Sequence, residues 1–71
     1  MKNYAYEVRK EQALTKAERL ADAFTADGID NIINREDKLG FVQVILPDFI
    51  DNDGCYYTLN FSYETGMAFN E

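Results

Sequence analysis

The alternation of side chains in residues 55–63 is the sequence feature that most limits how this chain can fold. Every second position is apolar, and the positions between are uncharged. Side chains of a strand point alternately to the two faces of a sheet, so the segment is predicted to be a strand with one buried face. The apolar set is Cys55, Tyr57, Leu59, Phe61 and Tyr63. Cys55 is therefore expected to be a small buried side chain and not a reactive thiol.

Two further segments are predicted to be strands. Residues 41–46 form the most strongly apolar run and are expected to be buried on both faces or nearly so. Residues 29–35 carry three isoleucines ahead of a polar turn at 36–38 that Gly40 closes. Pro47 lacks the N–H that pairing requires, so it is predicted to end regular pairing or to mark a bulge.

The dipeptide Asp53-Gly54 favours a two-residue hairpin turn, which would determine how the last two strands pair. In that register apolar residues oppose apolar residues. The expected pairs are Ile50 with Tyr57, Leu46 with Phe61 and Val44 with Tyr63. Asp48 fits this register poorly and is expected to be turned outward by a bulge beside Pro47.

A helix is predicted from Thr15, because Thr15 and Glu18 have the spacing of a capping box. Apolar residues recur at helical spacing up to Phe24, and Gly28 is a typical residue for ending the helix. Residues 3–9 alternate like a short strand, although their glutamate and lysine neighbours would also suit an early helix.

The 71 residues are expected to form a single small domain, residues 1–71. The predicted class is α+β in the order β-α-β-β-β, with the first strand left open. Its sheet has three or four strands, antiparallel or mixed, and one helix is packed on one face.

Several kinds of chemistry are not expected. The chain has no histidine and no glycine-rich phosphate loop, so we predict no enzyme activity, no catalytic residues and no cofactor. The loop at 47–54 resembles the middle of a calcium loop, but Phe49 would occupy its first ligand position. We therefore predict no metal site. The N-terminus lacks an apolar signal region and there is one cysteine, which together indicate a cytoplasmic protein with no membrane contact.

Charge is distributed unevenly along the chain. The net charge is −6, and all seven basic residues precede position 39. Phosphate contacts need clustered lysine and arginine, so no direct binding to nucleic acid is expected. A protein partner is expected instead, either a basic nucleic-acid-binding protein or a second copy of this chain.

The first hypothesis for that partner uses the acidic half of the chain. Asp51 and Asp53, two apart in an extended segment, would be about 7 Å apart. With Asp48 and Glu64 they would present a phosphate-like array to a basic groove. The protein would then be an inhibitor or modulator that occupies the nucleic-acid site of its partner, as small acidic phage anti-defence proteins do. The alternative is that these carboxylates simply face water.

The second hypothesis uses the sheet. The polar face of the last strand, including Tyr56 and Thr58, lacks the lysines or prolines that protect exposed strand edges. It would pair with a second copy, giving a homodimer, or accept a partner strand, and Phe49 in the turn would extend the interface. The alternative is that this strand is central in the sheet.

Overall fold

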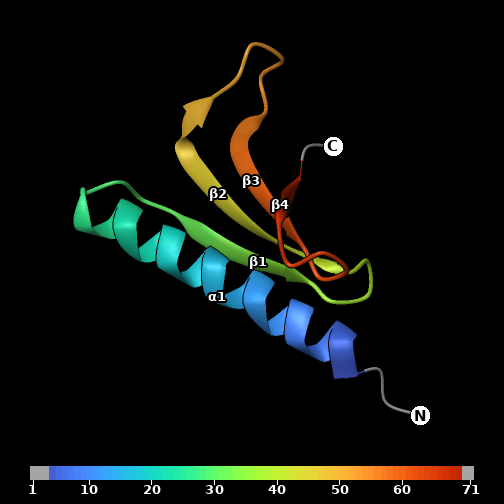
Figure 1. Cartoon of the computed structure of the whole chain (residues 1–71). Helices are drawn as coiled ribbons and strands as arrows, with labels where there is room; N and C mark the ends of the chain where they lie inside the picture. The colour runs from blue at the N-terminus through green and yellow to red at the C-terminus, as the bar shows by residue number, and fades with distance from the viewer. Residues whose placement is uncertain (1–3, 70–71) are drawn as a thin grey trace.

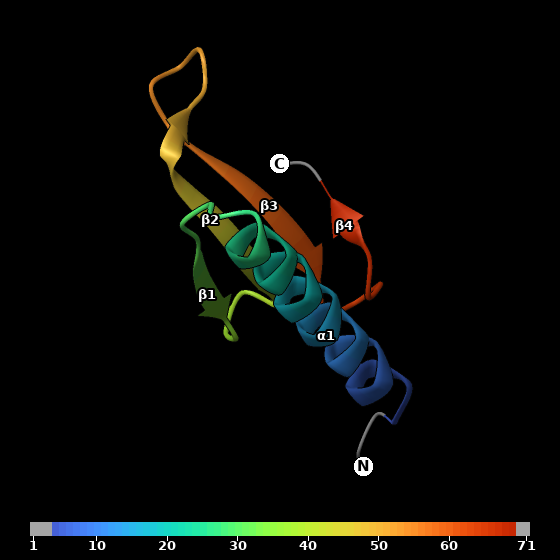
Figure 2. The same ribbon diagram turned by 90° about the vertical axis from the view of Figure 1, so that its left-hand side faces the viewer.

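One helix lies across one face of a four-stranded sheet in the computed structural model, which describes residues 4–69 (Figure 1). The elements are α1 (Tyr4–Ala26), β1 (Ile32–Glu36), β2 (Phe41–Ile50), β3 (Tyr56–Ser62) and β4 (Ala68–Phe69). The strands are antiparallel and lie in the order β1-β2-β3-β4. The predicted α+β class, with a single helix covering one face of the sheet, is confirmed (Figure 2).

The helix begins eleven residues earlier than the capping box predicted, because α1 starts at Tyr4. The strand alternative for residues 3–9 is wrong over residues 4–9, and residue 3 lies outside the described residues. Tyr6 packs against the core, and the ammonium of Lys10 lies 5.3 Å from the centre of the Tyr63 ring. These contacts, together with residues of high helix propensity, extend the helix back past Thr15.

The end of the helix is close to its predicted place. Gly28 has a φ of +78°, the left-handed conformation that ends many helices. The Asn31 side-chain amide then donates hydrogen bonds to the Ala21 carbonyl (3.2 Å), the Thr25 hydroxyl (3.0 Å) and the Ile29 carbonyl (3.1 Å). These bonds tie the chain to the last turns of α1, and β1 starts at Ile32, later than predicted.

The core lies between α1 and the inner face of the sheet. The helix contributes only small side chains to it, at one-turn intervals, and the sheet contributes larger ones. The buried apolar residues are Ala13, Ala17, Ala21, Val42, Val44, Leu46, Phe61 and Tyr63. In β2 the residues between them are half-buried, so this strand has one fully buried face and not two.

The register of β2 and β3 differs from the prediction by four residues. Leu46 lies opposite Tyr57 and Val44 opposite Leu59, where Phe61 and Tyr63 were expected. An even shift leaves the parity of these pairs unchanged, so apolar residues still meet apolar residues. Ile50 lies opposite Tyr56, where Tyr57 was expected, so the predicted pair of Ile50 with Tyr57 is wrong by one residue. The shift arises because the register changes between Leu46 and Ile50, which confirms the bulge expected at Pro47.

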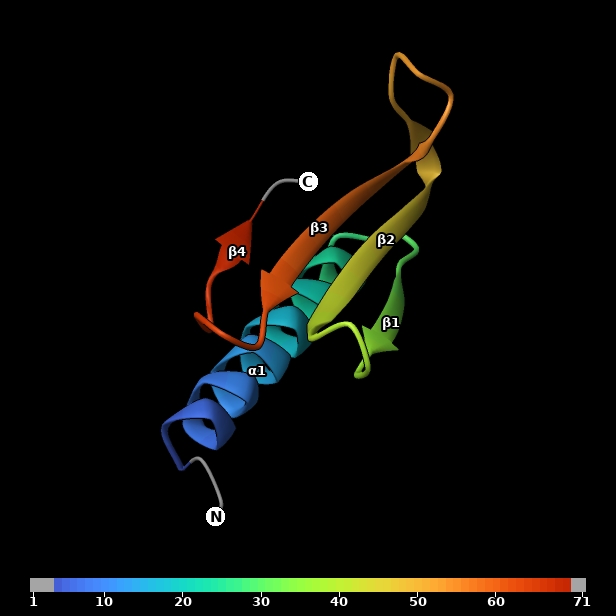
Figure 3. The ribbon, with the colours of Figure 1, turned by 90° about the vertical axis from the view of Figure 1, so that its right-hand side faces the viewer.

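The connection from β2 to β3 is a five-residue loop, residues 51–55, and not a two-residue turn. Beyond Ile45, the arm formed by β2 and β3 has no pairing with β1, and it projects away from α1 (Figures 1 and 3). Cys55 lies in this loop and is exposed, so the prediction of a buried thiol is wrong. Its strand begins one residue later, at Tyr56.

A strand at residues 68–69 was not predicted, although a sheet of three or four strands was. β4 pairs Phe69 with Asn60 and Ala68 with Phe61, at one end of β3. The chain reverses through Gly66, which is buried against α1: its carbonyl accepts a 2.9 Å hydrogen bond from the Lys16 ammonium. The β4 side of the helix therefore carries a basic residue.

Candidate partner-binding surfaces

The hairpin tip places its aspartates differently from the predicted array. Asp51 Oδ1 accepts hydrogen bonds from the backbone N–H groups of Asp53 (2.9 Å) and Cys55 (3.0 Å). The segment is therefore a turn organised by the Asp51 side chain, and the extended spacing predicted for Asp51 and Asp53 is wrong. Asp48 and Asp53 are exposed on this arm. Glu64 is also exposed, but it follows the opposite end of β3 and lies apart from the tip.

Apolar side chains are exposed along the same arm. Phe49 is 47% exposed, Ile50 63%, Tyr56 58% and Tyr57 55%. On the helix side of the arm a pocket of about 280 Å³ has an entirely apolar lining: Phe24, Ile29, Leu46, Phe49, Tyr57 and Leu59. Of the predicted partner-binding residues, Phe49 and Tyr56 are thus exposed on the part of the molecule that projects furthest from the helix.

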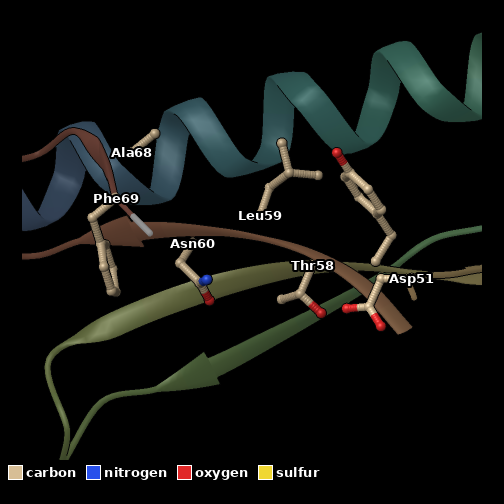
Figure 4. Close-up of a pocket in the computed structure, with 7 residues that line it drawn as sticks. Asp51, Thr58, Leu59, Asn60, Ala68 and Phe69 are labelled. Atoms are coloured by element: carbon tan, nitrogen blue, oxygen red, sulfur yellow. The ribbon is translucent and has the colours of Figure 1, made fainter. Parts of the chain in front are cut away.

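Asp51 and Thr58 line a second pocket, of about 310 Å³, along the edge of β3 (Figure 4). Thr58, Asn60 and Phe69 point to the side of the sheet away from α1, whereas Leu59 and Ala68 point toward the helix. β4 pairs with β3 at Asn60 and Phe61, so β3 is central there. Both descriptions predicted for residues 55–63 therefore apply to part of β3. It is a central strand at Asn60 and Phe61, and β4 does not pair with it at Thr58.

The uncovered face of the sheet carries a row of amides that sequence patterns did not reveal. The Asn34 amide donates to Gln43 Oε1, and the Gln43 amide donates to Asn60 Oδ1, each over 2.9 Å. These residues are direct cross-strand neighbours on β1, β2 and β3. Asn60, predicted to be on an outer polar face, is 7% exposed because it lies within this row. Phe41 and Phe69 lie beside it in an edge-to-face contact with ring centres 5.8 Å apart.

Charge is also aligned on the helix, a pattern that the predicted helix start at Thr15 did not reveal. Four exposed acidic residues fall within roughly 60° of the circumference of α1, given about 100° per residue. We call them the acidic side of α1: Glu7, Glu11, Glu18 and Asp22. An early helix start is what brings Glu7 and Glu11 into line with the others. The misplaced start at Thr15 concealed the pattern.

The acidic side of α1 borders β1. Glu7, Glu11 and Glu18 line a groove of about 350 Å³ together with Arg35 of β1. Lys10, Leu14 and Thr15 complete its lining. The helix thus has carboxylates and Lys10 toward β1, and Lys16 toward β4.

Arg35 is held in this groove by the turn that follows β1. Its guanidinium donates hydrogen bonds to Asp37 Oδ1 (3.2 Å) and Oδ2 (3.1 Å), and the Tyr63 hydroxyl donates to Asp37 Oδ1 (2.6 Å). The Tyr63 hydroxyl and then the Arg35 guanidinium lower the pKa of Asp37. Burial, and then the bond to Asp37, raises the pKa of Tyr63 to about 12. This cluster keeps one of the two basic side chains of the groove paired within the molecule.

Among residues 4–69, no group of three or more potential ligands is placed to hold a metal ion. No helix in that range is long and apolar enough to cross a membrane. Comparisons with protein-family models, with curated proteins and with solved structures find no match to this chain. Proposals about its function therefore depend on the surfaces described above.

Proposed function

We propose that this protein is a non-enzymatic, cytoplasmic binding protein that occupies a basic, nucleic-acid-binding surface of a partner protein. The observation that carries the proposal is the acidic side of α1. Its four carboxylates are presented in a row over about 22 Å of the helix axis, at 1.5 Å per residue. A nucleic acid backbone also presents negative charges in a regular row, and proteins bind that row with lysine and arginine.

The hairpin arm and the turn after β3 supply a second set of carboxylates, which we call the arm set. Asp48 and Asp53 are exposed at the tip, Glu64 is exposed beyond β3, and the chain has no basic residue from position 39 onward. Asp51 belongs to this half as well, but its carboxylate holds the turn together. The arm set and the helix set lie on different parts of the molecule. An experiment that neutralises each set separately can therefore locate the binding surface.

A second candidate function is attachment to a partner, or to a second copy, through the hairpin arm. The exposed apolar side chains of the arm, Phe49 and Ile50 with Tyr56 and Tyr57, favour this candidate. An interface built on them would bury apolar area and would be little affected by salt. The two candidates are therefore distinguished by ionic strength.

The test is capture of proteins from a host extract on the immobilised chain at low salt, followed by elution with duplex DNA as a competing polyanion. Two triple variants are compared with the original chain. The helix variant is Glu7→Gln, Glu11→Gln and Glu18→Gln, and the arm variant is Asp48→Asn, Asp53→Asn and Glu64→Gln. Each removes three negative charges from a net charge of −6 and leaves −3, so the two are matched in total charge.

We expect the captured proteins to be eluted by DNA and to be retained at least tenfold less by the helix variant than by the arm variant. Capture that resists both DNA and salt would contradict the proposal and would favour the apolar arm. Equal retention by both variants would mean that total charge matters and that the row on α1 does not.

A further inference from the structure

The outer edge of β1 has unpaired backbone groups beside the acidic groove. β1 is the first strand in the sheet order, and no strand within residues 4–69 pairs with its outer edge. The Glu36 carbonyl accepts a 2.8 Å hydrogen bond from Gly40 in the turn to β2, so the backbone of Glu36 points toward β2. Successive residues of a strand point their backbone groups to opposite edges. Ile33 and Arg35 therefore direct their N–H and C=O groups outward.

Ile33 and Arg35 also face the helix side of the sheet. Ile33 lies opposite Val44 and Arg35 opposite Val42, and both valines are buried beneath α1. Ile33 is nevertheless 42% exposed, because the outer flank of β1 is open. A strand added along this edge would place every second side chain next to these two residues, facing the groove that Glu7, Glu11 and Glu18 line.

We propose that the partner docks by adding a basic strand to the outer edge of β1, with lysine or arginine at alternate positions facing the acidic side of α1. Backbone hydrogen bonds to Ile33 and Arg35 would supply the pairing. The carboxylates of the groove would select the charge of the added strand. This inference rests on the proposed function, because it takes the partner to be basic.

Charge argues against a second copy as the occupant. Two copies joined edge to edge about a two-fold axis would present the same surface to each other. Their acidic sides, with four carboxylates each, would then lie on the same face of the joined sheet, and like charges in proximity repel. A basic strand has the opposite charge and removes this repulsion.

The inference is tested with a synthetic nine-residue peptide of alternating lysine and valine, blocked at both ends. Amide hydrogen exchange of the original chain is measured by NMR with and without this peptide. We expect the Ile33 and Arg35 amides to become at least tenfold more protected, while the Thr58 amide, on the opposite edge region of the sheet, is unchanged. Protection confined to Thr58 or to the arm would overturn the inference.

A matched pair of proline variants provides the second measurement. Ile33→Pro removes an outward N–H that β1 does not use for pairing with β2, and edge strands tolerate proline there. Thr58→Pro makes the same change on β3, beyond the residues that pair with β4. We expect Ile33→Pro to weaken peptide binding at least tenfold and Thr58→Pro to leave it within twofold, with folding of both checked by circular dichroism.

A control peptide separates strand addition from simple charge attraction. It has the same lysines and valines but carries N-methyl groups on alternate backbone nitrogens, so it cannot pair along one edge. We expect it to bind at least tenfold more weakly. Equal binding of the two peptides, or no binding of the unmethylated one, would overturn strand addition and leave the proposed function standing, because capture on a folded partner tests that function independently. A dimer of the chain alone that Ile33→Pro dissociates would show that a second copy is the occupant.

Discussion

The Tyr63 hydroxyl donates a 2.6 Å hydrogen bond to Asp37 and thereby joins the segment after β3 to the turn between β1 and β2. The Tyr63 side chain is fully buried, whereas Asp37 is half-exposed and also accepts two bonds from Arg35. The bond therefore connects the core to the Arg35–Asp37 ion pair, and Arg35 lines the groove beside the acidic side of α1.

Replacing Tyr63 with phenylalanine tests the contribution of this bond to stability. We expect Tyr63→Phe to lower the free energy of unfolding by about 1.5 kcal/mol, the size of a hydrogen bond to a charged group. Urea denaturation followed by circular dichroism measures the change. Tyr57→Phe is the control, because Tyr57 is 55% exposed, and it should change the free energy by less than about 0.5 kcal/mol. Equal losses in the two variants would assign no special role to the bond.

Alkaline pH should destabilise the protein through the same residue. The pKa of Tyr63 is raised to about 12 from an ordinary value of 10, first by burial and second by the Asp37 carboxylate. A raised pKa means that the folded state holds the proton more tightly than the unfolded state. The stabilisation is thus complete below pH 10 and is lost as the pH rises toward 12. Tyrosinate absorbance of the folded protein should show a late titration step that Tyr63→Phe lacks.

Gly66 is expected to tolerate no side chain. Its φ is +71°, and an added Cβ would lie 2.8 Å from Gln12 Oε1 and 3.1 Å from the Arg9 backbone carbonyl. Gly28 has a similar φ of +78° but nothing within 4 Å of such a Cβ. Both alanine variants carry the cost of a left-handed conformation, so their difference isolates the steric contact. We expect Gly66→Ala to lower the free energy of unfolding by about 1–3 kcal/mol more than Gly28→Ala does, as measured by urea denaturation. Equal losses would contradict a tight contact at Gly66.

The amide row on the uncovered face gives a prediction about coupling. Gln43→Leu removes the partner of both Asn34 and Asn60, and Asn60 is nearly buried, so the loss should be about 1–3 kcal/mol. In the double variant Gln43→Leu with Asn60→Leu no buried amide is left without its partner on β2. We expect it to be more stable than the sum of the two single changes, as measured by chemical denaturation. Simple additivity would show that the amides act independently.

The α+β class, the helix end at Gly28 and the bulge at Pro47 followed from short-range chemistry. Each depends on a backbone property of one residue or on an alternation read within one segment. Leu59, Phe61 and Tyr63 also lie on their predicted inner face, because a register error of four residues keeps the parity of the strand. Local information was therefore sufficient for the fold class, the end of the helix and the inner face of β3.

The helix start depends on a contact between residues far apart in the chain, and the hairpin loop depends on side-chain to backbone bonds of Asp51 within the loop; the capping-box and turn patterns contain neither. Lys10 lies over the ring of Tyr63, far along the chain, and Asp51 folds back on the N–H of Cys55. The capping-box pattern at Thr15 and the turn signal at Asp53-Gly54 were each outweighed by such contacts. The error at the helix start then hid the acidic side of α1, since its four members align only within a helix that already includes Glu7.

The alanines that α1 buries have a consequence for how the helix is positioned along the sheet. Ala13, Ala17 and Ala21 are spaced one turn apart, so a shift of the helix by one turn, about 6 Å, would superpose each methyl group on the place of the next. The packing of these three alanines alone distinguishes poorly between the two positions of the helix. The choice is made at its ends, where Asn31 bonds to the last turns of the helix and Gly66 fits closely against its second and third turns. In this protein the three buried alanines would allow the helix to slide along the sheet, and the contacts at its two ends fix its position.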